Sequence, residues 1–297
     1  MHRLGYWILI FLLKMFSVLP LGFHYRISGC LAFLLHKVIR YRYSTVITNI
    51  SRSFPELTYR QVTDIARDFY GYLADIIVES VWCYSASREK IGKQIEITGQ
   101  DDLHKALSNG KSAVIMLGHI GNWEIFTGLP DLRENYGLDI DNKDFIYIYK
   151  KPAGKIADMV INNIRKRHDS CFVIDTHSIF RHIVAHRNDR QVVFFICDQN
   201  PERSESRFTV DFLNQKTYMI DGPEQIAAKL GLPVLYCGLV RKGRRDNSAN
   251  FRLITENAAE CEPGYVTAEF ARRLEHDIRE HKAFWLWSHK RWKKRIL

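Results

Sequence analysis

Short apolar runs alternate with helical patterns through most of the chain, and this alternation most constrains the fold. Runs typical of buried strands occupy residues 113–117, 145–149, 171–174, 192–197, 234–240 and 251–255. Between them, apolar residues at helical spacing predict helices near 122–129, 155–167, 178–187 and 222–230, with a last helix over 267–281. Strands that alternate with helices are joined by crossovers, which favours parallel pairing. We therefore expect an α/β fold with a mixed, largely parallel sheet flanked by helices.

The first 96 residues have a different pattern and are predicted to be mostly helical. From Tyr59 to Trp82, apolar residues that include Val62, Ala66 and Phe69 recur at the spacing of a long amphipathic helix. A turn at 53–56 precedes this helix, and a new section opens at Gly99. We expect a helical N-terminal portion over residues 1–96 and an α/β domain over 97–297.

The start of this N-terminal portion is apolar, aromatic and basic. The apolar stretch 4–13 ends at Lys14, and a polar break at 24–26 interrupts the next one. No run therefore reaches the ~20 residues of a clean membrane span. The composition favours a hairpin or tilted helix in the lipid headgroup region, held by basic side chains against anionic lipid. Two alternatives are a helix buried in a soluble core and a signal peptide, although no small-residue cleavage site follows residue 13 closely.

Near the other end of the chain, three tryptophans lie close to basic residues, as the aromatic residues of the N-terminal stretch do. Trp285, Trp287 and Trp292 stand next to basic residues at 293–295. Tryptophan and basic side chains together are typical of a membrane interface, so we expect a second anchor there. The alternative is an aromatic edge of the core.

The net charge of +10 comes from the two ends of the chain. Residues 1–55 contain seven basic residues and no acidic one, and six more basic residues without an acid follow Glu280. Only 30 basic residues remain to set against all 33 acidic ones, so the body of the protein is close to neutral. A near-neutral body argues against nucleic acid as a partner.

The six cysteines are scattered, without CxxC spacing or neighbouring histidines. Such a distribution favours small buried apolar side chains in a reducing compartment over a metal site or a disulfide framework. We expect no metal.

The stretch LGHIGNWE, residues 117–124, follows the predicted strand 113–117 directly. Gly118 and Gly121 bracket a turn, Asn122 is placed to cap a following helix, and Glu124 then lies in its first turn. In an open α/β sheet, ligands bind beyond the carboxyl ends of the strands, where this turn lies. A carboxylate bonded to one nitrogen of His119 would fix the tautomer and leave the other nitrogen to accept a proton. The alternative is a histidine satisfied in a turn and a glutamate that complements a helix N-terminus.

A second polar pair, Asp198 and Gln199, follows the apolar run 192–197. It would lie at the carboxyl end of another strand and could share the crevice with His119. We predict that it positions substrate or basic side chains; the alternative is an aspartate that caps a turn.

With these features in place, the chain resembles the lysophospholipid and lipid A acyltransferases. HIGNWE is similar to their HxxxxD/E motif, in the form found in the lauroyl and myristoyl acyltransferases of lipid A biosynthesis. The other matching segments follow in that family's order: Asn49 with residues 53–57, Tyr149-Lys150-Lys151-Pro152 with Arg165 and Arg167, Cys197-Asp198-Gln199, and Trp287 through Trp292. The likeness runs from about residue 4 to residue 295.

This resemblance implies a fold like that of the glycerolipid acyltransferases and a role for each matching residue. His119 would be the general base and Glu124 its orienting partner, while Asn122, Asp198 and Gln199 would contact substrate. Lys151, Arg165 and Arg167 would bind a phosphate of the substrate. Lys151 stands where the family more often has arginine, which removes the bidentate fork and makes that contact weaker.

The resemblance also implies the reaction and its place. A fatty acyl chain would pass from a thioester of acyl carrier protein or coenzyme A to a hydroxyl of a lipid A precursor, without a cofactor, at the cytoplasmic face of the inner membrane. One alternative is the same chemistry on a lysophospholipid or another lipid hydroxyl. From a different class, the chain could be a lipid-binding protein without catalysis.

Overall fold

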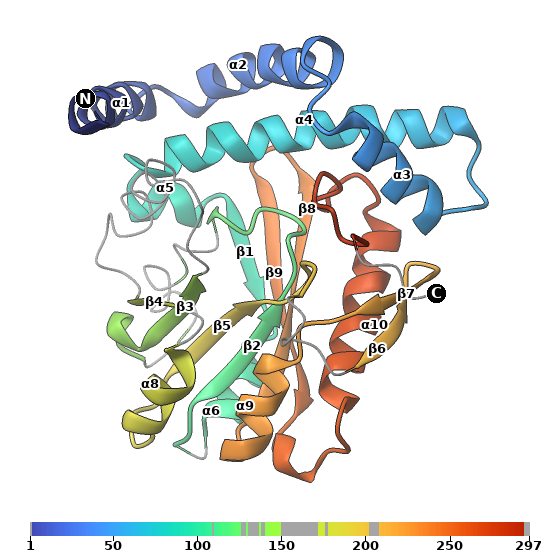
Figure 1. The fold of residues 1–297 in the computed structure, drawn as a ribbon. Helices are drawn as coiled ribbons and strands as arrows, with labels where there is room; N and C mark the ends of the chain where they lie inside the picture. The colour runs from blue at the N-terminus through green and yellow to red at the C-terminus, as the bar shows by residue number, and fades with distance from the viewer. Residues whose placement is uncertain are drawn as a thin grey trace.

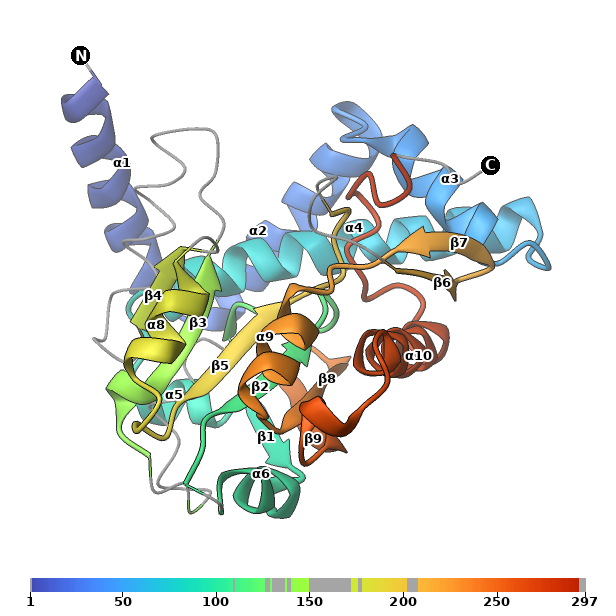
Figure 2. The same ribbon diagram turned by 60° about the horizontal axis from the view of Figure 1, so that its bottom comes forward.

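The computed structural model describes residues 2–108, 110–125, 129, 137, 140–149, 172–175, 178–201 and 208–293. Its centre is a seven-stranded sheet with the order β1-β9-β8-β2-β5-β3-β4 among these residues (Figures 1 and 2). The strands are β1 (Ile95–Thr98), β2 (Ala113–Leu117), β3 (Phe145–Tyr149), β4 (Phe172–Asp175), β5 (Val192–Ile196), β8 (Val234–Gly243) and β9 (Asp246–Thr255). A separate two-stranded ribbon joins β6 (Thr209–Phe212) and β7 (Gln215–Tyr218).

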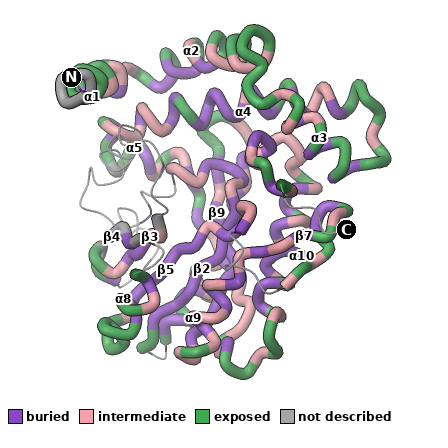
Figure 3. Tube along the Cα trace, in the orientation of Figure 1, coloured by how far each residue is buried: buried purple, intermediate pink, exposed green. Residues whose placement is uncertain are grey.

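Most of the sheet is parallel, as expected. β8, β2, β5, β3 and β4 pair in parallel, whereas β9 runs antiparallel to β8, and β1 is parallel to β9. All five residues of β2 are buried, which explains its unbroken apolar run. Figure 3 shows the buried segments concentrated along the central strands. The predicted mixed, largely parallel sheet flanked by helices is confirmed.

Helices cover this sheet. α6 (Gln100–Leu107) and α10 (Tyr265–Glu280) pack against β8 and β9, and α9 (Gly222–Leu230) packs against β2. The short helices α5 (Arg88–Gly92) and α8 (Ile179–Ala185) lie closer to the sheet's edges (Figure 1). The helices expected over 178–187, 222–230 and 267–281 are therefore confirmed, with ends that differ by a few residues. The helix expected over 155–167 lies outside the described residues.

The N-terminal portion is helical, with α1 (His2–Ser17), α2 (Leu21–Phe33), a π-helical turn η1 (Leu34–Val38), α3 (Tyr43–Ser53) and α4 (Tyr59–Cys83). Thr58 and Gln61 form a capping box that starts α4. α4 lies across the end of the sheet to which β2 points, and α2 packs on α4 (Figure 1). β1 begins at Ile95, so the expected boundary between residues 96 and 97 falls inside a strand. The division into two domains stays a prediction.

Large apolar side chains are exposed on the first helices. They are Trp7, Ile8, Leu9, Phe11, Leu12 and Met15 on α1, Val18 after it, Phe23 and Phe33 on α2, Leu34 and Val38 on η1, and Ile39. Within the described residues, no single helix has the length and apolar content of a membrane span. One pair of helical segments, Trp7–Ser17 and Leu21–Val38, has this length and apolar content when the two are taken together, but the pair is bent by 119° at the break between them.

The tryptophan prediction is wrong for two of its three residues. Trp285 and Trp287 are 2% and 0% exposed and belong to the main hydrophobic core, while Trp292 is half-buried. Their indole rings pack edge to face on one another and on Phe54 and Phe212. The aromatic edge of the core, the alternative considered for these residues, is what the structure shows.

Among the cysteines, Cys197 and Cys237 are buried as predicted, whereas Cys30 is exposed. Cys83 and Cys261 are half-buried, and Cys171 lies outside the described residues.

Candidate active site

The pairing of β2 with β5 brings the two polar segments of the sequence together. Leu117 is the register partner of Ile196, and the Cys197 amide donates to the Leu117 carbonyl at 3.0 Å. Parallel strands in register end at the same edge of the sheet, so the residues that follow them are neighbours. His119 and Asp198 therefore meet, as the sequence suggested.

Asp198 holds His119 at two points. The backbone amide of His119 donates to Oδ2 of Asp198 at 2.8 Å, and Nδ1 of the His119 ring lies 2.6 Å from Oδ1 of Asp198. Trp285 donates its indole N–H to Oδ2 at 2.7 Å. Because Asp198 accepts at Nδ1, the proton of the neutral imidazole is on that nitrogen and Nε2 is the free acceptor. The Gln199 side-chain nitrogen lies 3.2 Å from Nε2 and points a donor at it.

The carboxylate of Asp198 is buried but stays ionised. Burial by itself would raise its pKa, yet the electrostatic attraction of the adjacent His119 ring and the hydrogen bonds from His119 and Trp285 lower the pKa to about 2. Asp198 is 2% exposed. A charge this well buried orients the imidazole and stabilises it once it is protonated.

The turn after β2 requires its glycines. A Cβ on Gly118 would come within 2.7 Å of Leu274 Cδ1 and 3.3 Å of Asp198 Oδ2. Gly121 has φ +60°, and a Cβ there would lie 2.9 Å from the Leu239 carbonyl oxygen. The backbone of this turn can approach its neighbours only without side chains at these two positions.

Asn122 shapes the turn from within the core. Its Oδ1 accepts from the Ile125 amide at 3.0 Å, as a helix cap would, and its Nδ2 donates to Glu79. The side chain is 3% exposed. The expected capping role is thus seen, and substrate contact by Asn122 stays a prediction.

Glu124 is half-buried on the turn that continues from Asn122. Glu124 was expected to accept a hydrogen bond from one nitrogen of His119, and at Nδ1 the carboxylate in contact is that of Asp198. The part of Glu124 in orienting the base stays a prediction. Lys151, Arg165 and Arg167 lie outside the described residues.

A cavity of about 350 Å³ opens beside Gln199. Its walls are largely apolar and come from η1, α4 and the segment after α10: Leu35, Leu73, Ile77 and Leu286. Arg42 and His289 add polar groups to the same lining. The cavity therefore extends from Gln199, which contacts the His119 imidazole, to Leu35 of η1.

His289 is neutral in this cavity. Burial, together with the nearby charge of His119, lowers its pKa to about 4, although Asp198 acts in the opposite direction. Its Nδ1 is buried and has no hydrogen-bond partner. His289 therefore contributes no charge to the cavity lining.

The roles of Trp285 and His289 were not found from the sequence. Both follow α10, roughly 90 residues after Asp198, and only the folded structure shows that they lie close to Asp198 and Gln199. The spacing Trp-x-Trp-x-His offered a signal, but it was interpreted for Trp285 as a surface feature. Within the part of the chain that the structure describes, no group of three His, Cys, Asp or Glu side chains is arranged to hold a metal ion.

Comparison with protein families gives a match over nearly the whole chain. A family model described as bacterial lipid A biosynthesis acyltransferase matches residues 1–294. A search of curated proteins found no match.

Proposed function

Because the chain belongs to the bacterial lipid A biosynthesis acyltransferase family, and is therefore an acyltransferase, we propose that it transfers a fatty acyl chain from an acyl thioester to a hydroxyl of a lipid A precursor. The observation that carries the proposal is the hydrogen bond between His119 Nδ1 and the buried carboxylate of Asp198. It leaves Nε2 as a base at the carboxyl edge of the sheet.

In the proposed reaction, His119 Nε2 removes the proton of the acceptor hydroxyl as its oxygen attacks the thioester carbonyl. The C–O bond forms, and the tetrahedral intermediate collapses with cleavage of the C–S bond. The thiolate leaves with the proton from the imidazolium, which restores the neutral base. Asp198 stabilises the imidazolium between these steps, since its carboxylate is already ionised and in contact.

Other side chains are proposed to assist. Gln199 would leave Nε2 when substrate binds and donate to an oxygen of the reacting groups. Glu124 would place a second carboxylate near the imidazolium, and Lys151, Arg165 and Arg167 would bind substrate phosphate. These assignments rest on the position of each residue in the sequence and, for Gln199, on its 3.2 Å contact with Nε2.

The apolar surface suggests where the lipid substrates lie. The cavity beside Gln199 is large enough for part of an acyl chain and is bounded by η1, whose side chains include exposed Leu34 and Val38. We propose that α1, α2 and η1 rest in the cytoplasmic face of the inner membrane and that lipid enters from there. The acyl donor would be a thioester of acyl carrier protein or of coenzyme A.

A transfer assay tests the reaction. The purified chain is given a labelled acyl thioester, on either carrier and over a series of chain lengths, with a lipid A precursor in vesicles. His119→Ala should lower transfer by roughly 10²–10⁴-fold, the usual contribution of a general base. His276→Ala, an exposed histidine on α10, is the matched control and should transfer normally. Full transfer by a folded His119→Ala protein would refute the proposed base.

Lipid analysis tests the acceptor. Cells without the gene should contain under-acylated lipid A, whereas altered phospholipids with unchanged lipid A would favour a lysophospholipid acceptor instead. A lipid-binding protein without catalysis would form no acylated product in the transfer assay, although it would still bind vesicles.

A further inference from the structure

A buried polar network connects α2 with the turn that carries His119. Its acidic members, Asp75 and Glu79, lie on α4 and are 6% and 1% exposed. Arg241 at the end of β8 is 3% exposed and bonds both carboxylates, at 2.9–3.0 Å. The network is thus fixed at its centre by an ion pair that water barely reaches, a type that is costly to break.

Glu79 is where the two ends of this network meet. Oε1 accepts from the Tyr25 hydroxyl of α2 at 2.7 Å, and Oε2 accepts from Asn122 Nδ2 on the catalytic turn. Three residues from three distant parts of the chain therefore form one continuous path. The Asn122 end of that path also caps the turn through Ile125.

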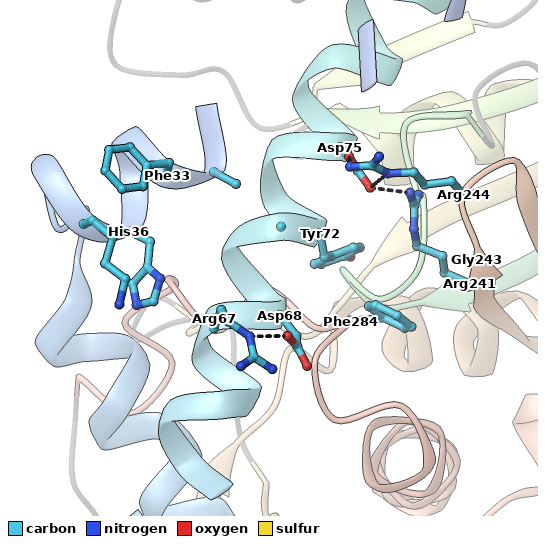
Figure 4. Close-up of a pocket in the computed structure, with 13 residues that line it drawn as sticks. Phe33, His36, Arg67, Asp68, Tyr72, Asp75, Arg241, Gly243, Arg244 and Phe284 are labelled. Atoms are coloured by element: carbon cyan, nitrogen blue, oxygen red, sulfur yellow. Dashed lines mark hydrogen bonds and ion pairs between the residues drawn. The ribbon is translucent and has the colours of Figure 1, made fainter. Parts of the chain in front are cut away.

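Asp75 has two further partners besides Arg241, one on α2 and one between β8 and β9. Ser28 of α2 donates to Oδ1, and Arg244 bonds both oxygens at 3.0 Å. In Figure 4, Asp75 lies between the guanidinium groups of Arg241 and Arg244. Neither Ser28 nor Asp75 bonds the catalytic turn in the described contacts. Tyr25 and Ser28 thus lie one turn apart on α2. Tyr25 bonds Glu79, the partner of Asn122, directly, whereas Ser28 reaches Glu79 only through Asp75 and Arg241.

A cavity borders this network. It has a volume of about 550 Å³ and is lined by Phe33 and His36 on one side and by Tyr72 and Asp75 of α4 on the other (Figure 4). Beside this space, α2 and η1 still pack directly on α4: Leu21 and Tyr25 form an apolar cluster with Trp82, and the His36 ring stacks on that of Tyr70. The position of α2 and η1 is therefore transmitted to α4 both by this packing and by polar contacts, of which the Tyr25 bond is the one that reaches Glu79 directly.

We propose that Glu79 is a positioning residue which, through Tyr25, couples the docking of α1 and α2 on a lipid surface to the geometry of the His119 turn. The proposal rests on the proposed lipid-surface function. When the apolar helices bind lipid, α2 becomes ordered, and the hydrogen bond from Tyr25 then fixes the position of Glu79. Glu79 in turn holds Asn122 in the position that sets the conformation of the His119 turn. A misplacement of about 1 Å in a reacting group costs roughly 10²-fold in rate, so such support has a catalytic effect.

Hydrogen exchange tests the coupling without relying on activity. Backbone amides of residues 118–125 are followed in the full chain, with and without vesicles of anionic phospholipid. In the wild type and in Ser28→Ala, vesicles should increase protection of these amides. In Tyr25→Phe they should not, although vesicle binding measured by co-sedimentation stays the same. Equal protection in Tyr25→Phe, an equal loss in Ser28→Ala, or no vesicle effect in the wild type would overturn the proposal.

Kinetics supply the second measurement. Tyr25→Phe should lower kcat by about tenfold with KM unchanged, because it removes one hydrogen bond to a charged group. If Tyr25→Phe fails to fold, Asn122→Ser breaks the path at its other end, since serine can still cap the turn but no longer reaches Glu79 as a donor. Should the wild type show the vesicle effect but no acyl transfer, the coupling stands and the proposed reaction fails.

Discussion

The carboxylate that orients His119 is 79 residues away from it in sequence, and sequence spacing pointed to a nearer one. Glu124 was the natural candidate because it lies in the same motif. Asp198 was placed in the same crevice, but its bond to Nδ1 depends on the register of β2 with β5, which no single sequence shows. The place of His119 on a glycine-bracketed turn at the end of a strand was thus predictable, whereas its contact with Asp198 was not; the catalytic roles of His119 and Glu124 stay predictions.

Asp198 should make stability depend on pH. Its pKa in the folded chain, about 2, is below the ordinary value, so its contribution is complete above about pH 4 and is lost as pH falls towards 2. Denaturant unfolding of wild type and Asp198→Asn should therefore show the largest difference at neutral pH and a shrinking one below pH 4. A difference that grows as pH falls would contradict the assigned charge state.

Gly121 should be intolerant of a side chain. Gly121→Ala forces alanine into a left-handed conformation and against the Leu239 carbonyl, which should cost about 1–3 kcal/mol in the free energy of unfolding. Gly71→Ala is the control, because Gly71 lies within α4 and nothing stands within 4 Å of a Cβ there. That change should stabilise the chain by about 0.5–1 kcal/mol, as alanine favours a helix. Equal effects from the two substitutions would exclude strain at the turn.

At the scale of elements, the predictions were correct for segments whose pattern of burial is regular along their length. The central strands are buried on both faces and gave unbroken apolar runs, and α4 has a clear amphipathic spacing. β1, with Glu96 exposed between buried Ile95 and Ile97, and the polar ribbon β6–β7 lack such runs and were missed. Short polar strands are defined by their pairing, which local sequence does not encode.

The exposed face of α1 should bind lipid. Phe11 is 61% exposed, so Phe11→Ser leaves the folded chain unchanged but removes a side chain available to the bilayer. Full burial of phenylalanine contributes roughly 1.5–3 kcal/mol, so vesicle affinity should fall by about tenfold or more. Val184→Ser, which changes an exposed apolar residue on α8 far from α1, should bind vesicles normally (Figure 1). Equal affinity of the two variants would show that α1 makes no lipid contact.

At the scale of the whole molecule, the helices with exposed apolar side chains lie on one side of α4, and the edge of the sheet that carries His119 lies on the other (Figure 1). α4 contacts both, through Tyr25 on α2 and through Tyr72, whose hydroxyl donates to the Gly121 carbonyl at 2.6 Å. The basic ends of the chain noted in the sequence include Arg42, which bonds the Ser288 carbonyl at 3.1 Å. The segment before α3 and the segment after α10 therefore meet, although the two termini lie far apart (Figure 1).

The third donor to Asp198 has a consequence for the order of synthesis. Residue 119 is synthesised before residue 198, and both are synthesised before Trp285. Until residue 285 has been made, Asp198 lacks one of its hydrogen bonds. A nascent chain that already contains His119 and Asp198 therefore cannot yet form the complete set of contacts around the buried carboxylate.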